Sequence, residues 1–205
     1  MVLAGKSHVK PNNVFQWTHY FPKVNNRYIP LEKIDDYLKN VNKPFCLIIA
    51  SDYPHGPFPK TGNYSKADIF KLPYDPNYVG NHKPGYYQNI QDDNDQLGKV
   101  LEMVEKYGHE ESSMFIYASD HGLSGKWSLQ EQGLRLPFIV RWPGKTKPNT
   151  TSETLLTLVD VLPTILEVSK TKIPREIDGK SFVESLKGYD KQINEYIYGV
   201  ATRQN

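Results

Sequence analysis

Three short apolar runs, separated by stretches with helical periodicity, constrain the fold of this chain more than any other feature of its sequence. They cover residues 45–50, 114–118 and 137–142. Continuous apolar runs of this length, bounded by polar and turn residues, are typical of strands that are buried on both faces of a sheet. Apolar residues recur at three- and four-residue steps in the segments that we expect to be helices, residues 31–38, 86–107 and 154–168. Strands that alternate with helices favour a layered α/β architecture with a mainly parallel sheet.

Residues 51–84 form one long stretch without a steady period, rich in Pro, Gly, Tyr, Asn and Asp. We interpret it as a single surface excursion, because loops of this length in a compact domain are usually functional or disordered. No linker, repeat or low-complexity tract divides the rest of the chain. Residues 1–205 are therefore predicted to form a single domain.

Composition and charge exclude several classes of protein. The chain has 205 residues, 38% of them hydrophobic, which is enough for one sizeable core. Its 25 Lys and Arg are balanced by 23 Asp and Glu and are spread along the chain, so we predict no nucleic-acid partner. No run approaches the roughly 18 apolar residues of a membrane span, and the apolar start is too short for a signal peptide. The single cysteine, Cys46, lies in the first apolar run, so we expect a buried, inert thiol and no disulfide within the chain.

The second apolar run is followed by Asp120-His121-Gly122, which places a carboxylate and an imidazole at the carboxyl edge of the predicted sheet. Open α/β sheets bind ligands at this edge. Asp120 suits a hard cation such as Ca²⁺, whereas His121 is a softer donor that contacts the ion, the substrate or neither. The alternative interpretation is a capping Asp beside a surface His, and the dipeptide alone does not exclude it.

Basic residues near two other predicted strand ends are further candidates. His55 follows the first apolar run as Asp120 follows the second, and if these strands run parallel the two residues emerge at the same edge and can converge. A His between prolines is also a common turn residue. Lys6 and His8 are two residues apart, so in an extended segment both point to one side and can hold a tetrahedral anion. Exposed Lys and His near a chain end are equally ordinary surface residues.

The order of these motifs is more specific than any one of them. They are Gly-Lys-x-His (5–8), Pro-His-x-Pro-Phe (54–58), Tyr-Tyr (86–87), Ser-Asp-His-Gly (119–122), Gly-Lys (125–126) and Gly-Leu-Arg-Leu-Pro-Phe-Ile-Val-Arg-Trp-Pro-Gly (133–144). In this order the chain resembles the type I, formylglycine-dependent sulfatases. The segments around Asp160 and Asp178 also look like this family, and the resemblance extends from about residue 3 to about residue 200.

The resemblance implies a fold and a reaction. Sulfatases have an alkaline phosphatase-like α/β domain, so the expected fold is part of a three-layer α/β/α domain with a mainly parallel sheet. They hydrolyse sulfate esters or N-sulfated sugars with a formylglycine nucleophile and Ca²⁺, for which Asp120 and His121 resemble ligands. Fixed cations in such a site stabilise the negative charge that develops on the leaving oxygen.

The resemblance also implies roles for the other basic candidates. Lys6 and His8 resemble the pair that orients and assists the formylglycine hydroxyls. His55 resembles the histidine beside the bridging ester oxygen, where it also binds substrate. Lys126 resembles the lysine that contacts the sulfate oxygens.

Some features of the family pattern are not found in this sequence. In the family, an Asp-Asp pair and a Cys-x-Pro-x-Arg motif precede the Gly-Lys-x-His segment, which here follows only four residues. Cys46 is followed by Leu-Ile-Ile-Ala and does not fit the formylglycine precursor, and the pairs Asp35-Asp36 and Asp92-Asp93 lie in predicted helices as solvated residues. A small subdomain expected after about Tyr198 is also not found. We therefore expect an incomplete catalytic domain that lacks its nucleophile and has little turnover alone.

The leading functional hypothesis is a sulfatase whose partner is a sulfated small molecule or glycan. One alternative is a phosphonate or phosphodiester hydrolase of the same superfamily, and another is a non-catalytic remnant that binds sulfated glycans. The family resemblance suggests a periplasmic, extracellular or lysosomal location. The sequence does not define the substrate or the oligomeric state.

Overall fold

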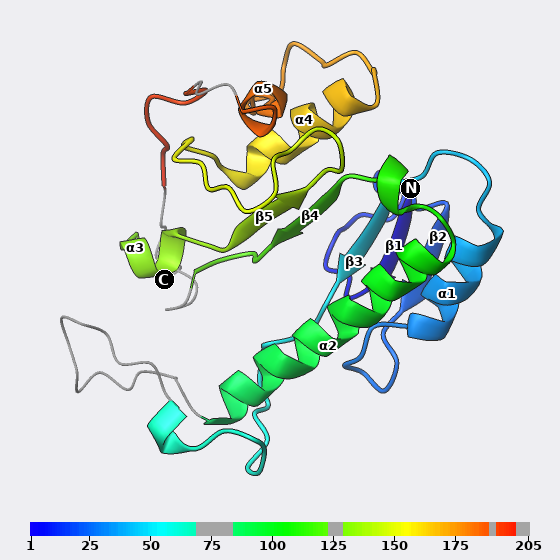
Figure 1. Cartoon of the computed structure of the whole chain (residues 1–205), viewed down its shortest axis with the longest axis vertical. Helices are drawn as coiled ribbons and strands as arrows, with labels where there is room; N and C mark the ends of the chain where they lie inside the picture. The colour runs from blue at the N-terminus through cyan, green and yellow to red at the C-terminus, as the bar shows by residue number, and fades with distance from the viewer. Residues whose placement is uncertain (69–83, 123–128, 189–191, 200–205) are drawn as a thin grey trace. The chain divides into compact units, whose positions relative to one another are not determined.

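The computed structural model describes residues 1–68, 84–122, 129–188 and 192–199. The chain divides into two compact units, Met1–Glu110 and Glu111–Asn205, each of which is described by itself (Figure 1). The prediction of one domain over the whole chain stays a prediction.

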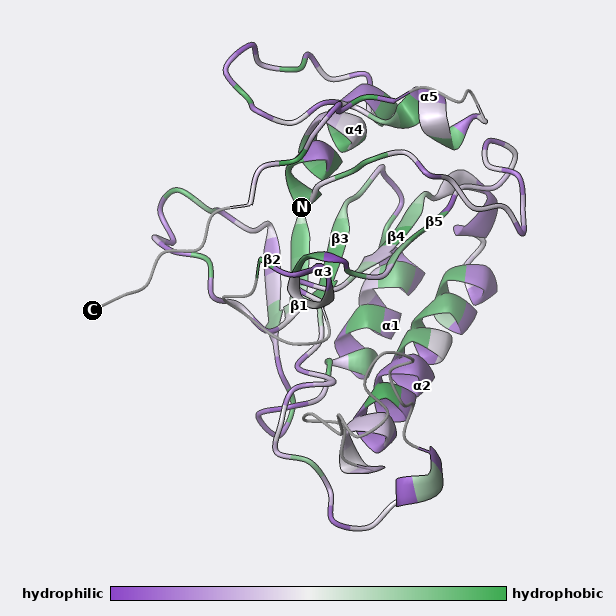
Figure 2. Cartoon of the chain, turned by 90° about the vertical axis from the view of Figure 1, so that its left-hand side faces the viewer, coloured by the Kyte–Doolittle hydropathy of each residue, from purple (hydrophilic) through white to green (hydrophobic). Residues whose placement is uncertain are grey.

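The first unit is built on a parallel sheet. Its strands are β1 (Val2–Gly5), β2 (His19–Pro22) and β3 (Leu47–Ala50), in the order β2-β1-β3. Every residue of the central strand β1 is buried. Figure 2 shows β1 and β3 as hydrophobic ribbons, whereas the edge strand β2 is mixed. The mixed character of β2 explains why the sequence predicted β3 but not β2.

Two helices, α1 (Leu31–Asn40) and α2 (Pro84–Lys106), pack against each other in this unit (Figure 1). Their buried apolar side chains include Ile34, Leu38, Val100 and Val104. The Tyr107 hydroxyl, just beyond α2, lies 3.0 Å from both carboxylate oxygens of Asp35 on α1. Asp35 is therefore an interhelical hydrogen-bond acceptor and not merely a solvated residue.

The second unit contains a short antiparallel pair of strands, β4 (Phe115–Ala118) and β5 (Phe138–Arg141). The helices α4 (Val161–Val168) and α5 (Val183–Leu186) lie on one side of this pair in Figure 1. Phe182, which is 1% exposed, contacts Phe138 of β5 with ring centroids 5.7 Å apart. Because β4 and β5 are antiparallel, the parallel arrangement predicted from the sequence holds for the first unit only.

The remaining elements are short. They are α3 (Glu131–Leu134) and the 3₁₀ turns η1 (Lys66–Asp68), η2 (Glu110–Ser112) and η3 (Leu158–Asp160). The helix predicted over residues 154–168 begins later than expected, because Thr157 and Asp160 form a capping box that starts η3, and α4 follows it directly. Pro163 lies in the first turn of α4, where its missing N–H leaves no helical bond unmade.

The described helices do not include one that is both long enough and apolar enough to cross a membrane. Cys46 lies directly before β3 and is partly buried. Burial raises the pKa of its thiol, an effect that the positive chain terminus only partly opposes. A raised thiol pKa agrees with the weakly reactive cysteine that the sequence predicted.

Candidate active site

Lys6, Lys23 and Asp52 lie at the carboxyl edge of the parallel sheet, one after each strand. The register pairs the last residue of β1 with the last residues of β2 and β3. Lys6 and Lys23 follow β1 and β2 directly, and Asp52 follows β3 after one intervening residue. Because the three strands are parallel, all three side chains are brought to one edge of the sheet.

Gly5 allows β1 and β3 to approach closely where Lys6 leaves the sheet. Its φ is +102°, and a Cβ at this position would collide with the carbonyl oxygen of Ala50. The backbone N–H of Lys6 donates a 2.8 Å hydrogen bond to the same carbonyl. The backbone from which the Lys6 side chain extends is therefore fixed by the neighbouring strand.

Asp52 joins the two lysines. Lys23 Nζ donates a 2.7 Å hydrogen bond to Asp52 Oδ2, and Lys6 Nζ lies 3.7 Å from Oδ1. Partial burial alone would raise the pKa of Asp52, but the hydrogen bond and charge of Lys23 and the charges of Lys6 and His55 outweigh it and hold the pKa below its usual value. Asp52 is therefore ionised at neutral pH, and one carboxylate faces two ammonium groups.

His55 lies in the turn that follows Asp52, and its side chain is exposed. Its Nδ1 is 2.8 Å from the carbonyl oxygen of Gly56. A carbonyl oxygen can only accept a hydrogen bond, so we assign the proton of neutral His55 to Nδ1. Nε2 then carries the lone pair of the neutral ring and is the nitrogen that is not engaged by this anchor.

The backbone around His55 is held by two other elements. Asn89 of α2, which is 1% exposed, donates from Nδ2 to the carbonyl oxygens of Pro54 (3.3 Å) and His55 (3.1 Å). Arg27, from the connection between β2 and α1, donates to the same His55 carbonyl at 3.2 Å. The Arg27 guanidinium also lies 4.2 Å from the centroid of the Tyr53 ring. Helix α2 and the β2–α1 connection thus fix the turn that carries the imidazole.

The other two basic candidates are less constrained by the described structure. His8 is exposed, two residues beyond the half-buried Lys6. Lys126 lies outside the described residues. Its predicted contact with sulfate oxygens stays a prediction.

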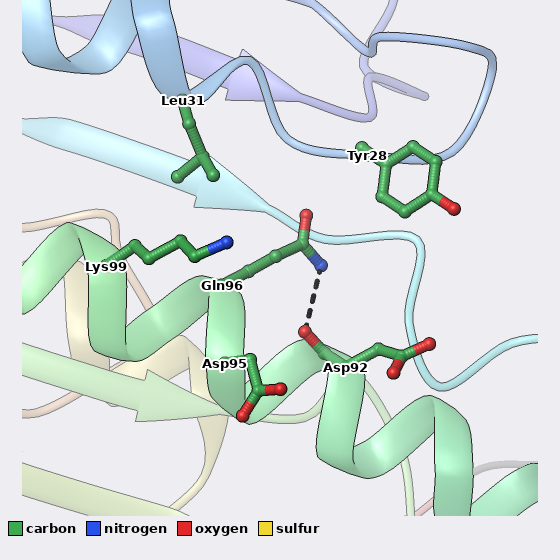
Figure 3. Close-up of a pocket in the computed structure, with 6 residues that line it drawn as sticks. All are labelled: Tyr28, Leu31, Asp92, Asp95, Gln96 and Lys99. Atoms are coloured by element: carbon green, nitrogen blue, oxygen red, sulfur yellow. Dashed lines mark hydrogen bonds between the residues drawn. The ribbon is translucent and has the colours of Figure 1, made fainter. Parts of the chain in front are cut away.

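A shallow hollow lies beside this edge in the same unit, between α2 and the start of α1 (Figure 3). It has a volume of about 310 Å³ and is lined by Tyr28, Leu31, Asp92, Asp95, Gln96 and Lys99. Gln96 is buried and accepts a 3.0 Å hydrogen bond from the backbone N–H of Ile29, so it joins α2 to the β2–α1 connection. Two carboxylates and one ammonium group line this hollow, which disfavours an anion, so the edge that carries Lys6 and Lys23 is the better candidate for an anion site.

In the second unit, Asp120 and His121 form a turn directly after β4. Ser119 Oγ donates a 2.6 Å hydrogen bond to the carbonyl oxygen of His121 and closes the turn. His121 Nδ1 lies 2.8 Å from the Gly122 carbonyl oxygen, the same anchor that His55 has in the first unit. The Asp120 side chain is 73% exposed, and its Oδ1 lies 3.7 Å from His121 Nε2. β3 and β4 belong to different units, so the predicted convergence of His55 and Asp120 stays a prediction.

Comparison with known proteins identifies the family to which these motifs belong. The sequence profile of the sulfatase family matches residues 13–171. The chain belongs to the sulfatase family. It is 44% identical over 215 residues to an ulvan-active sulfatase of Formosa agariphila, in an alignment that covers 100% of this chain and 43% of the relative. The chain spans less than half the length of this relative and of the next two curated sulfatases, at 39% and 37%.

Solved sulfatase structures show the same fold. A sulfatase candidate from Bacteroides thetaiotaomicron has a TM-score of 0.68 at 19% identity, over 95% of this chain and 55% of that one. A protein solved with its substrate D-glucosamine-2-N,6-O-disulfate has a TM-score of 0.65 at 16% identity, over 96% of this chain and 63% of that one. The predicted alkaline phosphatase-like α/β fold with a parallel sheet is confirmed.

The donor chemistry of the second unit fits part of the calcium site that the sulfatase family implies. Calcium binds six to eight oxygen atoms, and the exposed Asp120 carboxylate is an oxygen donor of the required kind. The His121 imidazole offers a nitrogen, which calcium prefers less. In residues 1–68, 84–122, 129–188 and 192–199, no group of three or more His, Cys, Asp or Glu side chains is placed to hold a metal ion. Calcium binding therefore stays a proposal.

The sequence did not indicate three residues that shape this candidate site. Asp52 precedes His55 by three positions and could have been found as the acidic neighbour of a basic motif. Lys23 could not, because the mixed sequence of β2 concealed the strand end that it follows. Asn89 was not recognised because it lies in a polar stretch of the α2 sequence, and its 1% exposure marks it as a structural residue.

Proposed function

We propose that this chain is the sulfate-binding part of a sulfuric ester hydrolase that acts on a sulfated glycan. The observation that carries the proposal is the group of basic side chains, Lys6, Lys23 and His55, at the carboxyl edge of a parallel sheet in a member of the sulfatase family. Cationic side chains at fixed positions stabilise the charge that develops when a sulfate ester is cleaved. An ulvan-active sulfatase as a relative, and a structural neighbour with a disulfated glucosamine substrate, support the sulfated glycan.

The proposal assigns a role to each basic residue. Lys6 and Lys126 bind the oxygen atoms of the sulfate, and His8 assists at the nucleophile. In its protonated form His55 donates the Nε2 proton to the leaving oxygen and becomes the neutral Nδ1–H imidazole, since Nδ1 is engaged by the Gly56 carbonyl. In the sulfatase family the nucleophile is a formylglycine, and Cys46, which is followed by Leu-Ile-Ile-Ala, does not fit its precursor motif.

Calcium is the metal that we propose for the complete site. Asp120 would contribute a carboxylate oxygen, and His121 would lie at the neighbouring ligand position. The ion would stabilise negative charge on the sulfate oxygens. The location of the protein, periplasmic, extracellular or lysosomal, also stays a proposal from the family resemblance.

A chimera tests the proposed function. This chain would replace the aligned segment of the Formosa agariphila sulfatase, which supplies the remainder of a full-length enzyme. We expect release of sulfate from ulvan, and loss of about a hundredfold or more in rate when His55 is changed to Ala, because general acid catalysis typically contributes this much. Lys33→Met, an exposed change on α1, is the control and should retain the rate.

The same chimera separates the alternatives. Faster hydrolysis of an aryl phosphonate than of an aryl sulfate would support the phosphonate hydrolase. A folded chimera that binds sulfated glycan in calorimetry without releasing sulfate would support the non-catalytic remnant. Unchanged sulfate release by the His55→Ala chimera would contradict the role of the imidazole.

A further inference from the structure

We propose that Lys23 is the permanent counter-ion of Asp52, and that this pairing leaves the Lys6 ammonium group available for an incoming tetrahedral anion. The inference rests on the proposed function, since it specifies how the anion site of that function is kept open. Lys23 is a positioning residue in this view, because it acts on the anion through Asp52 and Lys6.

The two ion pairs of Asp52 differ in kind. The Lys23 Nζ to Oδ2 distance of 2.7 Å is that of a charge-assisted hydrogen bond. The Lys6 Nζ to Oδ1 distance of 3.7 Å is too long for a hydrogen bond. An anion that approaches Lys6 therefore has no hydrogen bond to break, whereas one that approaches Lys23 has to displace a carboxylate.

The arrangement of the three strands determines where the two lysines and Asp52 lie. Lys6 and Lys23 follow strand residues that are paired in register, and Asp52 follows the strand on the other side of β1. The Lys23 side chain consequently reaches Asp52 at the same edge from which Lys6 extends. Both lysine side chains are about three-quarters buried, with exposed fractions of 28% for Lys6 and 24% for Lys23, which limits the positions that each ammonium group can take.

The charges around Asp52 determine what would follow without Lys23. The charged and titratable groups that act on Asp52 are Lys6, Lys23 and His55. Arg27 is directed elsewhere, to the Tyr53 ring and the His55 carbonyl. With Lys23 present, the carboxylate is neutralised and Lys6 contributes a net positive charge. Without Lys23, Lys6 would be the one ammonium partner of Asp52 among the described residues, and the two charges would cancel where the anion should bind.

The first test follows the lysine ammonium groups of the full chain by ¹⁵N NMR during a titration with inorganic sulfate. We expect the Lys6 Nζ resonance to shift and the Lys23 Nζ resonance to stay unchanged, because Lys23 keeps its hydrogen bond to Asp52. Equal shifts of both resonances would show that Lys23 is itself a sulfate ligand and would overturn the inference.

The second test measures the sulfate dissociation constant of variants by calorimetry. Lys23→Met should weaken sulfate binding roughly five- to tenfold, because the Lys6 ammonium group would then be held in an ion pair with Asp52. The double change Lys23→Met with Asp52→Asn should restore binding to within about twofold of the original chain, because no carboxylate remains to hold Lys6. Lys23→Arg should bind as the original chain does, since Arg also pairs with a carboxylate.

The control is Lys33→Met, which removes the same charge from an exposed position of α1. If Lys33→Met weakens binding as much as Lys23→Met, the effect is one of net charge and the inference fails. The pairing itself is tested without sulfate by the pKa of Asp52 in ¹³C NMR, which should rise in Lys23→Met. An unchanged Asp52 pKa would overturn the inference whether or not sulfate binds, whereas no sulfate binding by a chain with an intact pair would overturn the anion site itself.

Discussion

At the scale of single residues, three aspartates of this chain show how strongly surroundings decide what a carboxylate does. Asp52 is held by ammonium groups, Asp120 is largely exposed after a strand, and Asp160 is 1% exposed and bonded to backbone and amide groups. Asp120 is the most exposed of the three and is the one that we propose as a calcium ligand. The other two act on the protein itself.

The lowered pKa of Asp52 predicts a pH dependence of stability. A carboxylate with a depressed pKa in the folded state stabilises the fold above its ordinary pKa, and this contribution is lost as the pH falls through the folded value. Urea unfolding should therefore show the original chain to be more stable than Asp52→Asn near pH 6. The difference should disappear towards about pH 2, where the protonated acid resembles the amide. A difference that is constant over this range would contradict the prediction.

Asp160 predicts a stability effect in the second unit. Its carboxylate accepts hydrogen bonds from the backbone N–H groups of Thr157 (2.9 Å) and Lys180 (2.8 Å) and from the Asn194 amide (2.9 Å). Asp160→Asn places an amide group opposite a donor and should lower the free energy of unfolding by about 1–3 kcal/mol, measured by urea denaturation. Asp178→Asn, an exposed change in the same motif region, should stay within about 0.5 kcal/mol of the original chain. Similar losses in both variants would contradict the role of burial.

Single residues were predictable where a motif carried them. His55, Asp120 and His121 lie at the strand ends that the apolar runs predicted, because a run of buried residues marks its own end. The structural role of Asp160, whose carboxylate accepts three hydrogen bonds, was not predictable in the same way. Thr157 is a local partner in a capping box, but Lys180 and Asn194 are 20 and 34 residues away, and no local pattern records these two contacts.

At the scale of elements, the candidate site depends on segments that leave the sheet and return to it. The β2–α1 connection supplies Lys23 and Arg27, and α2 supplies Asn89. Helical periodicity predicted α1 and α2 within a few residues. The apolar runs predicted β3, β4 and β5. They did not predict β2, whose four residues are mixed in character, or β1, whose apolar residues stop at Ala4.

The contact between α2 and the His55 turn predicts a local effect. Asn89→Ala removes both hydrogen bonds to the Pro54 and His55 carbonyls and should cost about 1–3 kcal/mol in the free energy of unfolding. Hydrogen exchange should also become faster at residues 52–58. The matched control is Asn94→Ala, an exposed position of the same helix, which should leave the exchange of this turn unchanged. Slow exchange at residues 52–58 in Asn89→Ala would show that Arg27 alone holds the turn.

At the scale of the whole molecule, the candidate residues divide between two compact units. Lys6, His8 and His55 belong to Met1–Glu110, and Asp120 and His121 belong to Glu111–Asn205. The alternation of strands and helices predicted the α/β class. It gave no sign of the division, because the antiparallel pairing of β4 with β5 closes a separate small sheet that an apolar run does not distinguish from a parallel one.

The division into two units predicts that residues 1–110, produced without the second unit, retain the ion pair of Lys23 and Asp52. Among the residues that the structure describes, the partners of Asp52, together with Arg27 and Asn89, lie within residues 1–110. A protein of these residues should show the same Lys23 Nζ resonance in ¹⁵N NMR as the full chain. A resonance typical of a solvated lysine would show that the second unit is required to form the pair.

The shared anchor of His55 and His121 limits which side chains could replace them. In each case the ring nitrogen nearer the backbone is bonded to the carbonyl of the following glycine, so only the farther nitrogen faces outward. The side-chain amide of asparagine could replace Nδ1 as the donor to the glycine carbonyl, but it has no group at the position of Nε2. The longer glutamine side chain would reach the position of Nε2 but would lose the hydrogen bond to the glycine carbonyl. No single amide side chain reproduces both ends of the ring, and each turn therefore has a structural as well as a chemical reason to carry an imidazole.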